Sequence, residues 1–240
     1  MTLNGGTLTA GTGINNNGNF NFTSGHISMG GGMTVGNGGL LGNNVALSSS
    51  RTLSLSGGAN IDAGANLSVS SGISNISDGL TNSGTINVTG GQLNVNGAIT
   101  NNNRVNIASG ATFGDDSATT TTDFVQEAGR TTVNGTLSAD TVVINGGVLD
   151  GAGVIDASLT IAGGSYNPGN SPGSMEVTGD FVLSEFGTLN LEIGRDSLDP
   201  AGYIFDEIIV GGNYDLQGGL ITFTLLDDLN ITDFENDFGF

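Results

Sequence analysis

Between residues 63 and 113, apolar and polar positions alternate in short runs that repeat at a fixed interval. The residues that recur every 19 positions are Leu67, Ile86 and Val105, with Gly72, Gly91 and Gly110. A period near twenty that contains no helical spacing is typical of a solenoid built from short strands. The sequence therefore predicts an all-β fold, namely a right-handed parallel β-helix or β-solenoid.

The same interval separates two short segments that end in asparagine. Residues 80–82 (Leu-Thr-Asn) return as residues 99–101 (Ile-Thr-Asn). If successive coils stack at the strand spacing of about 4.8 Å, Asn82 and Asn101 occupy the same position in neighbouring coils. We therefore expect their side-chain amides to form hydrogen bonds along the stack.

The remainder of the chain divides into three parts. Residues 1–173 are predicted to form solenoid coils, with looser repeats before residue 63 and eleven or twelve coils along the whole chain. Residues 174–225 contain longer apolar strands, for example 204–210, which would cap the open end of the same solenoid and block edge pairing. Residues 226–240 form an acidic tail with an incomplete end.

Composition agrees with short strands and many turns. Glycine accounts for 43 of 240 residues, apolar residues for 36% and charged residues for only 11%, which does not suit a disordered chain. Cysteine is absent, so neither a disulfide framework nor a thiolate metal site exists. No apolar run approaches the roughly 20 residues of a membrane helix, and repeat-like sequence starts directly after Met1. We expect a fragment of a longer protein whose export signal and anchor lie elsewhere.

The net charge of −19 lies almost entirely in the second half of the chain. Residues 1–120 contain four acids and two arginines, whereas residues 121–240 contain the other 19 acids and two arginines. Such a surface repels phosphates and anionic lipid headgroups. We therefore expect neither nucleic acid binding nor membrane insertion by this segment.

Three segments after residue 122 carry a resemblance to a known family. Residues 123–137 contain Gln-x-x-Gly-x-Thr-x-Val-Asn-Gly, residues 142–155 contain Gly-Gly-x-Leu-x-Gly-x-Gly, and residues 168–173 read Pro-Gly-Asn-Ser-Pro-Gly. In this order they resemble the passenger regions of bacterial autotransporters. The resemblance implies export through a bacterial outer membrane and a structural, adhesive role at the cell surface or outside the cell. It also implies a host-surface, glycan or matrix component as partner.

A charged, threonine-rich insertion interrupts the repeat, and insertions in solenoids map to surface loops that sometimes bind partners. The simpler interpretation is a surface loop that the fold tolerates. In that case, deletion of the loop leaves folding intact. Its residues are also the first candidates for adhesive contact: Asp115, Asp116, Thr119, Thr120, Thr121 and Thr122.

An enzyme is the competing interpretation, because many polysaccharide lyases and glycosidases are β-helices. Their chemistry needs paired carboxylates, or acids that hold a cation beside a base. This chain has no lysine and one histidine, and Asp140, Asp150 and Asp156 have only Arg130 nearby in the sequence. We predict no enzymatic activity. A secreted polysaccharide-active enzyme and a self-associating matrix or filament protein remain the alternatives.

Metal and nucleotide sites have weak support. His26 stands alone, without a second ligand at a suitable spacing, so we expect a surface or turn residue. The segment 151–156 has neither the third glycine nor the following helix of a dinucleotide site. We expect no cofactor and, at most, weak nonspecific Ca²⁺ binding by loop acids; those considered are Asp196, Asp199, Asp206, Glu207, Asp227 and Asp228.

Overall fold

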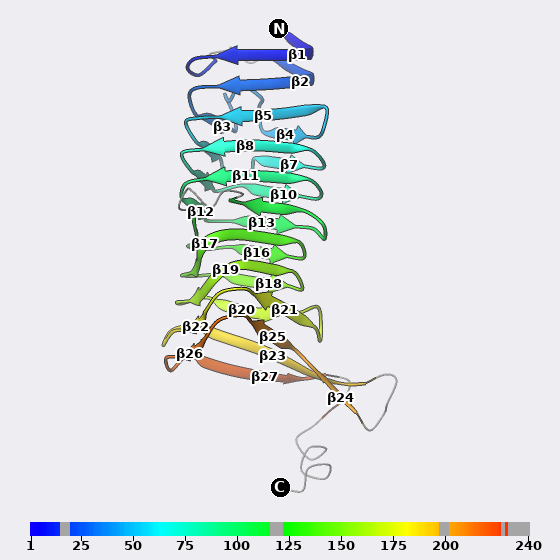
Figure 1. Ribbon diagram of the computed structural model, residues 1–240, viewed down its shortest axis with the longest axis vertical. Coiled ribbons are helices and arrows are strands. Elements are labelled where there is room, and N and C mark those ends of the chain that lie inside the picture. Colours follow the sequence, from blue (N-terminus) through cyan, green and yellow to red (C-terminus); the bar gives the residue numbers. More distant parts are fainter. Residues whose placement is uncertain (15–19, 116–121, 197–201, 227–228, 230–240) are drawn as a thin grey trace, which may run out of the picture.

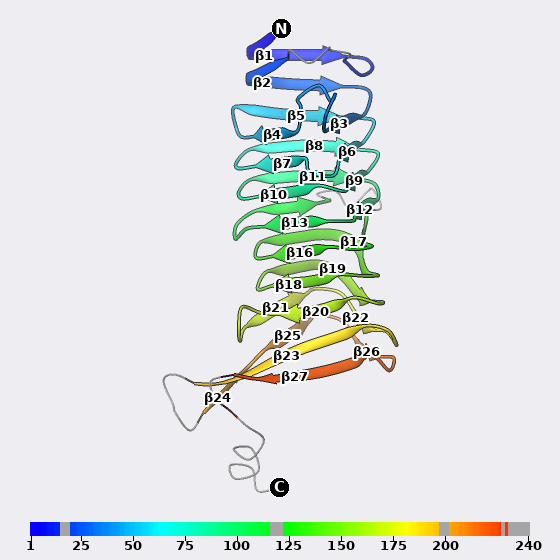
Figure 2. The ribbon, with the colours of Figure 1, turned by 180° about the vertical axis from the view of Figure 1, so that it is seen from behind.

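The protein is an elongated stack of β-coils, with β1 at one end and β27 at the other (Figure 1). The computed structural model describes residues 1–14, 20–115, 122–196, 202–226 and 229. Parallel pairing connects each coil to the next, and the view from behind shows the same stacking (Figure 2). The predicted all-β fold and parallel β-solenoid are therefore confirmed. Within this part of the chain, no helix is long and apolar enough to cross a membrane.

The strands form three columns, which we call faces 1, 2 and 3, and a typical coil contributes one strand to each. Face 1 contains β4 (Asn44–Leu47), β7 (Asn66–Val69), β10 (Thr85–Val88), β13 (Arg104–Ile107), β16 (Arg130–Val133), β18 (Val148–Gly151), β20 (Ser165–Pro168), β23 (Thr188–Arg195) and β27 (Leu220–Leu225). Face 2 contains β1 (Thr2–Ala10), β2 (Asn21–Met29), β5 (Arg51–Leu55), β8 (Ile73–Ser77), β11 (Gln92–Asn96), β14 (Thr112–Gly114), β21 (Ser174–Val177) and β25 (Glu207–Val210). Face 3 contains β3 (Met33–Val35), β6 (Ala59–Ile61), β9 (Leu80–Asn82), β12 (Ile99–Asn101), β15 (Asp123–Gln126), β22 (Phe181–Leu183) and β26 (Tyr214–Leu216).

Three strands depart from this scheme. β17 (Thr136–Ile144) and β19 (Val154–Ile161) pair with strands of both face 2 and face 3, which joins these faces into one 17-stranded sheet. β24 (Tyr203–Phe205) is antiparallel to β23 and extends from the C-terminal part of the stack (Figure 1).

The 19-residue repeat in the sequence corresponds to the register in which strands of neighbouring coils pair. Ile86 pairs with Leu67 on one side and with Val105 on the other, and all three side chains are at most 1% exposed. Alternate residues of each strand point inward and stack on like residues of the next coil, which forms one continuous core. Because no single coil can bury its apolar face alone, stability accumulates from neighbouring coils.

A polar ladder lies inside this core, as predicted. The Asn82 amide donates to the Asn101 side-chain oxygen at 2.8 Å. The Asn101 amide donates in turn to Gln126 at 3.2 Å and to Thr131 at 3.1 Å. All four residues are fully buried, so these bonds satisfy polar groups that water does not reach.

The number of coils predicted from the sequence is wrong. The stack has about eight turns with a strand on every face, plus partial turns at its two ends, rather than eleven or twelve turns. Coil length varies along the chain: paired residues lie 26 positions apart at Ile27 and Leu53, 17 apart at Asp150 and Asn167, and 32 apart at Asn190 and Thr222. At about 4.8 Å per turn, eight turns extend on the order of 40 Å.

The predicted strand 204–210 is also wrong, because two strands, β24 and β25, flank Asp206. The Asp206 carboxylate accepts hydrogen bonds from the backbone N–H groups of Gly173 at 2.8 Å and Glu192 at 2.9 Å. Its own N–H donates to the Glu192 carbonyl at 2.9 Å. These three bonds fix the chain where it changes direction from the antiparallel strand to the parallel one.

Residues 174–225 continue the same solenoid, and β25, β26 and β27 form its last rung. In this rung Tyr214, Leu216 and Phe223 are 59%, 56% and 63% exposed. The preceding rung, by contrast, buries Phe181 and Leu183 almost completely. Within the described residues this rung is the uncovered end of the stack, so the predicted role of residues 174–225 as a cap stays a prediction.

Candidate functional site

The outward side chains of face 1 form a polar row along the stack. Strand register aligns Ser68, Asn87, Asn106, Thr132, Asp150, Asn167, Asn190 and Thr222. The Asn106 amide donates to Asn87 at 2.7 Å, and the Asn190 amide donates to Asn167 at 2.7 Å. Face 1 thus presents amides, hydroxyls and a carboxylate at the strand spacing.

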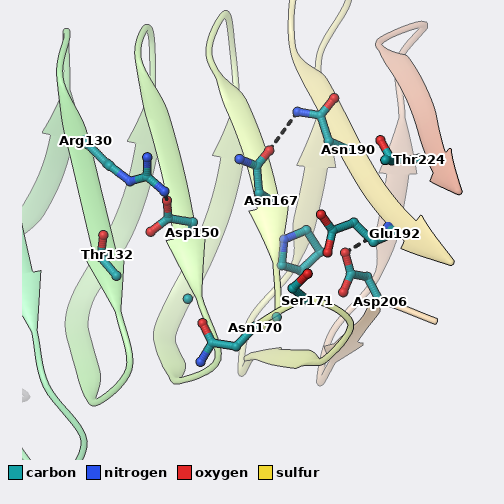
Figure 3. Close-up of a pocket in the computed structure, with 13 residues that line it drawn as sticks. Arg130, Thr132, Asp150, Asn167, Asn170, Ser171, Asn190, Glu192, Asp206 and Thr224 are labelled. Atoms are coloured by element: carbon teal, nitrogen blue, oxygen red, sulfur yellow. Dashed lines mark hydrogen bonds and ion pairs between the residues drawn. The ribbon is translucent and has the colours of Figure 1, made fainter. Parts of the chain in front are cut away.

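A groove of about 480 Å³ lies over the C-terminal part of this row (Figure 3). Its floor consists of outward side chains from successive strands of face 1. Its lining is Arg130, Thr132, Asp150, Gly151, Asn167, Pro168, Gly169, Asn170, Ser171, Asn190, Glu192, Asp206 and Thr224. Most of these residues offer a side-chain hydrogen-bonding group, so the groove suits a polar ligand.

The turn at residues 168–173 forms one wall of the groove. The Gly169 N–H donates to the Gly151 carbonyl at 2.7 Å, which ties the turn to the preceding coil. The Asn170 amide donates to the Asn134 side-chain oxygen at 3.2 Å. The Pro-Gly-Asn-Ser-Pro-Gly segment that stood out in the sequence is therefore part of the groove.

The groove carries a surplus of negative charge. Arg130 forms an ion pair with Asp150, whose side chain is 9% exposed, while the arginine side chain is 50% exposed. Burial raises the pKa of Asp206 above its usual value, although the backbone N–H groups of Gly173 and Glu192 partly offset this effect. The nearby Glu192 carboxylate raises the Asp206 pKa further.

A second hollow, of about 600 Å³, adjoins the groove at Asp206, which lines both. It carries exposed apolar surface, with Ile204 and Phe205 38% and 51% exposed. The Tyr203 and Phe205 rings lie 6.4 Å apart, and the Arg195 guanidinium lies over the Tyr203 ring at 5.5 Å. Polar and aromatic surfaces are thus contiguous here.

The insertion predicted from the sequence has buried ends. Thr122 is fully buried, its hydroxyl donates to the Val95 carbonyl at 3.2 Å, and it accepts from the Gly97 N–H at 3.2 Å. Asp115 is only 9% exposed. These two residues are not exposed contact residues, which corrects that part of the prediction. Residues 116–121, which include the remaining candidates, lie outside the described residues, so their role in binding stays a prediction.

The structure separates the three aspartates that the sequence placed near Arg130. Asp150 pairs with Arg130 and lines the groove. Asp140 accepts a hydrogen bond from a backbone N–H, and Asp156 accepts one from a threonine hydroxyl at 2.9 Å. Only Asp150 therefore belongs to the candidate site.

His26 is not part of the candidate site, and of the loop acids considered for Ca²⁺, Asp206 lines the groove. His26 lies within β2, half-buried, with Nδ1 2.8 Å from the Thr52 hydroxyl. In the part of the chain that the structure describes, no group of three or more His, Cys, Asp or Glu side chains is arranged to hold a metal ion. The calcium candidates outside that part are Asp199, Asp227 and Asp228.

Comparison with known proteins assigns no family to this chain. No protein-family model matches it, and no curated protein or solved structure does either. The fold and the groove therefore carry the functional argument.

Sequence reasoning missed the groove because its residues come from coils of unequal length. Asp150, Asn167 and Asn190 share one outward row, yet the spacing between them varies. The signal that could have found the site is the turn at 168–173, which breaks the repeat beside this row.

Proposed function

We propose that this chain is the rigid stalk of an adhesive surface protein that works outside the cell, similar to the passenger regions of bacterial autotransporters. The observation that carries the proposal is the continuous core, in which inward residues from Phe22 to Leu189 form one buried cluster. Because each coil forms hydrogen bonds with both neighbours, bending the stack would break many bonds together. Such a rod holds binding surfaces at a fixed distance from an anchor.

In this proposal the groove on face 1 is the contact surface, and it binds without catalysis or a cofactor. Both oxygens of Asp206 accept backbone hydrogen bonds, and the Asp150 carboxylate is paired with Arg130. These partners suit fixed recognition groups better than groups that exchange protons during a reaction. The partner would be a glycan, host-surface or matrix component rather than nucleic acid or membrane, given the net charge of −19.

Two measurements on the purified chain test this proposal. Small-angle X-ray scattering should give an elongated particle, as expected for a stack of about eight turns. Beads coated with the chain should adhere to mucin-, collagen- or cell-coated surfaces more strongly than beads coated with albumin. Equal retention of both kinds of bead on every surface would refute the adhesive role.

A secreted polysaccharide-active enzyme is the second candidate, and one observation favours it. Asp206 has a raised pKa and lies beside Glu192 in a groove, an arrangement that can provide a general acid. Incubation with a panel of polysaccharides distinguishes the two candidates. New reducing or unsaturated ends that disappear in Asp206→Asn would favour the enzyme.

A further inference from the structure

The groove and its neighbouring hollow combine three features of a site for sugars. Sugar hydroxyls both donate and accept hydrogen bonds, and the Asn167 and Asn190 amides offer both functions. The apolar faces of sugar rings pack on aromatic side chains, and Phe205 is 51% exposed in the adjoining hollow. Asp206 connects the amide row with this aromatic surface, because it lines both the groove and the adjoining hollow.

The third feature is a buried carboxylate that forms an ion pair with a half-exposed arginine. Asp150 is 6% exposed and lines the groove (Figure 3). Apart from its ion pair with Arg130, its oxygens accept no hydrogen bond from the described residues. The ion pair holds the Arg130 side chain, which is 50% exposed, in the groove, where its N–H groups can donate hydrogen bonds to sugar hydroxyls.

The charge of the groove indicates whether its ligand is acidic or neutral. Asp150, Glu192 and Asp206 line the groove with Arg130 as the cation among its lining residues. This surplus of negative charge repels uronate and sulfated polysaccharides. A neutral sugar chain satisfies the hydrogen-bonding groups without that repulsion.

We propose that the groove between Arg130 and Thr224, together with the aromatic surface at Phe205, binds a neutral, hydroxyl-rich oligosaccharide. This inference rests on the proposed adhesive function and specifies its ligand. The chain of sugars lies along the polar row of face 1, with one ring against Phe205. Because the row repeats at the strand spacing, consecutive sugars meet consecutive coils.

The test uses the full chain and an array of immobilised oligosaccharides. The array contains neutral glucose, mannose, galactose and N-acetylglucosamine oligomers, acidic uronate and sulfated oligomers, and cationic glucosamine oligomers. We expect retention on at least one neutral series and none on the acidic series. The strongest neutral oligomer is then titrated in solution by calorimetry.

The polar row offers a matched pair of variants. Asn190→Ala removes the amide bonded to Asn167 inside the groove, and Asn106→Ala removes the equivalent amide bonded to Asn87 outside it. We expect at least about a ten-fold rise in Kd for Asn190→Ala and less than about two-fold for Asn106→Ala. Thermal unfolding of both variants verifies that each is folded at the temperature of the titration.

A second matched pair of variants tests the aromatic contact. Phe205→Ala should weaken binding about ten-fold, whereas Phe186→Ala, at a residue that is 75% exposed outside both hollows, should leave the Kd unchanged. The proposal is wrong if no neutral oligomer binds, if acidic or cationic oligomers bind instead, or if the groove variants bind like their controls. Beads that still adhere to surfaces in those cases would leave the adhesive role intact and exclude only this ligand.

Discussion

The Asn82 side-chain amide donates a 2.8 Å hydrogen bond to the Asn101 side-chain oxygen one coil further along the stack. This bond connects two coils inside the core, in addition to the backbone ladder between β9 and β12. Because both side chains are fully buried, a shift of either coil by one residue would leave amides without partners. The pair therefore specifies the register as well as stabilising it.

Removal of this ladder should destabilise the protein strongly. We expect Asn101→Ala to lower the free energy of unfolding by about 2–4 kcal/mol, because Asn82, Gln126 and Thr131 each lose one buried hydrogen bond. Urea-induced unfolding measured by circular dichroism tests this. The control is Asn103→Ala, which removes an exposed 3.3 Å bond to the Ser83 carbonyl and should change stability by less than about 0.5 kcal/mol. Equal effects of the two variants would contradict a special role for the buried ladder.

Two glycines at the same repeat position should respond differently to alanine. Gly91 and Gly110 have φ angles of 69° and 77°, so alanine at either site adopts a left-handed backbone at about 1–2 kcal/mol. A Cβ atom at Gly91 would lie 2.7 Å from the backbone nitrogen of Gly72, whereas one at Gly110 would meet nothing within 4 Å. We therefore expect Gly91→Ala to lower stability by at least about 1 kcal/mol more than Gly110→Ala. Denaturant midpoints measured side by side test the difference, and a larger effect at Gly110 would contradict it.

These two predictions concern the part of the fold that the sequence predicted well. The 19-residue spacing set the register of β7, β10 and β13, because equal coils place like residues above one another. The ladder of Asn82 and Asn101 followed from the same spacing. Local periodicity is sufficient wherever coils have equal length.

The candidate site could not be predicted in this way. Asp206 contacts Gly173 and Glu192 because an antiparallel strand, β24, interrupts the coil before it. No period in the sequence records that excursion, and apolar alternation across residues 204–210 suggested one continuous strand instead. Loop geometry and contacts between distant segments decide such sites, and a single sequence reports neither directly.

Asp206 should make stability depend on pH. Its pKa in the folded protein is raised, mainly by burial, above its value in the unfolded chain. Between the two pKa values the folded state binds more protons, so this residue stabilises the fold at low pH and loses that contribution as pH rises through the folded pKa. Asp206→Asn cannot titrate, so its stability relative to the wild type should increase with pH.

The measurement is urea-induced unfolding of wild type and Asp206→Asn at several pH values between about 3.5 and 7. The variant loses an acceptor for the N–H groups of Gly173 and Glu192, so its absolute stability is lower at acidic pH. The diagnostic quantity is therefore the slope of the stability difference against pH. A flat difference, or a difference that falls as pH rises, would contradict the raised pKa.

The uncovered last rung should make the chain associate with itself. Leu216 and Phe223 are 56% and 63% exposed, and they lie on strands whose outer edges have no partner strand among the described residues. Exposed apolar side chains beside unpaired strand edges favour association between chains. Light scattering of the wild type should therefore rise with protein concentration. Leu216→Ser and Phe223→Ser should reduce this rise, whereas Phe186→Ser, at an exposed residue outside the last rung, should not. If the wild type stays monomeric at all concentrations, the last rung does not mediate self-association. That result would also weigh against a filament-forming protein.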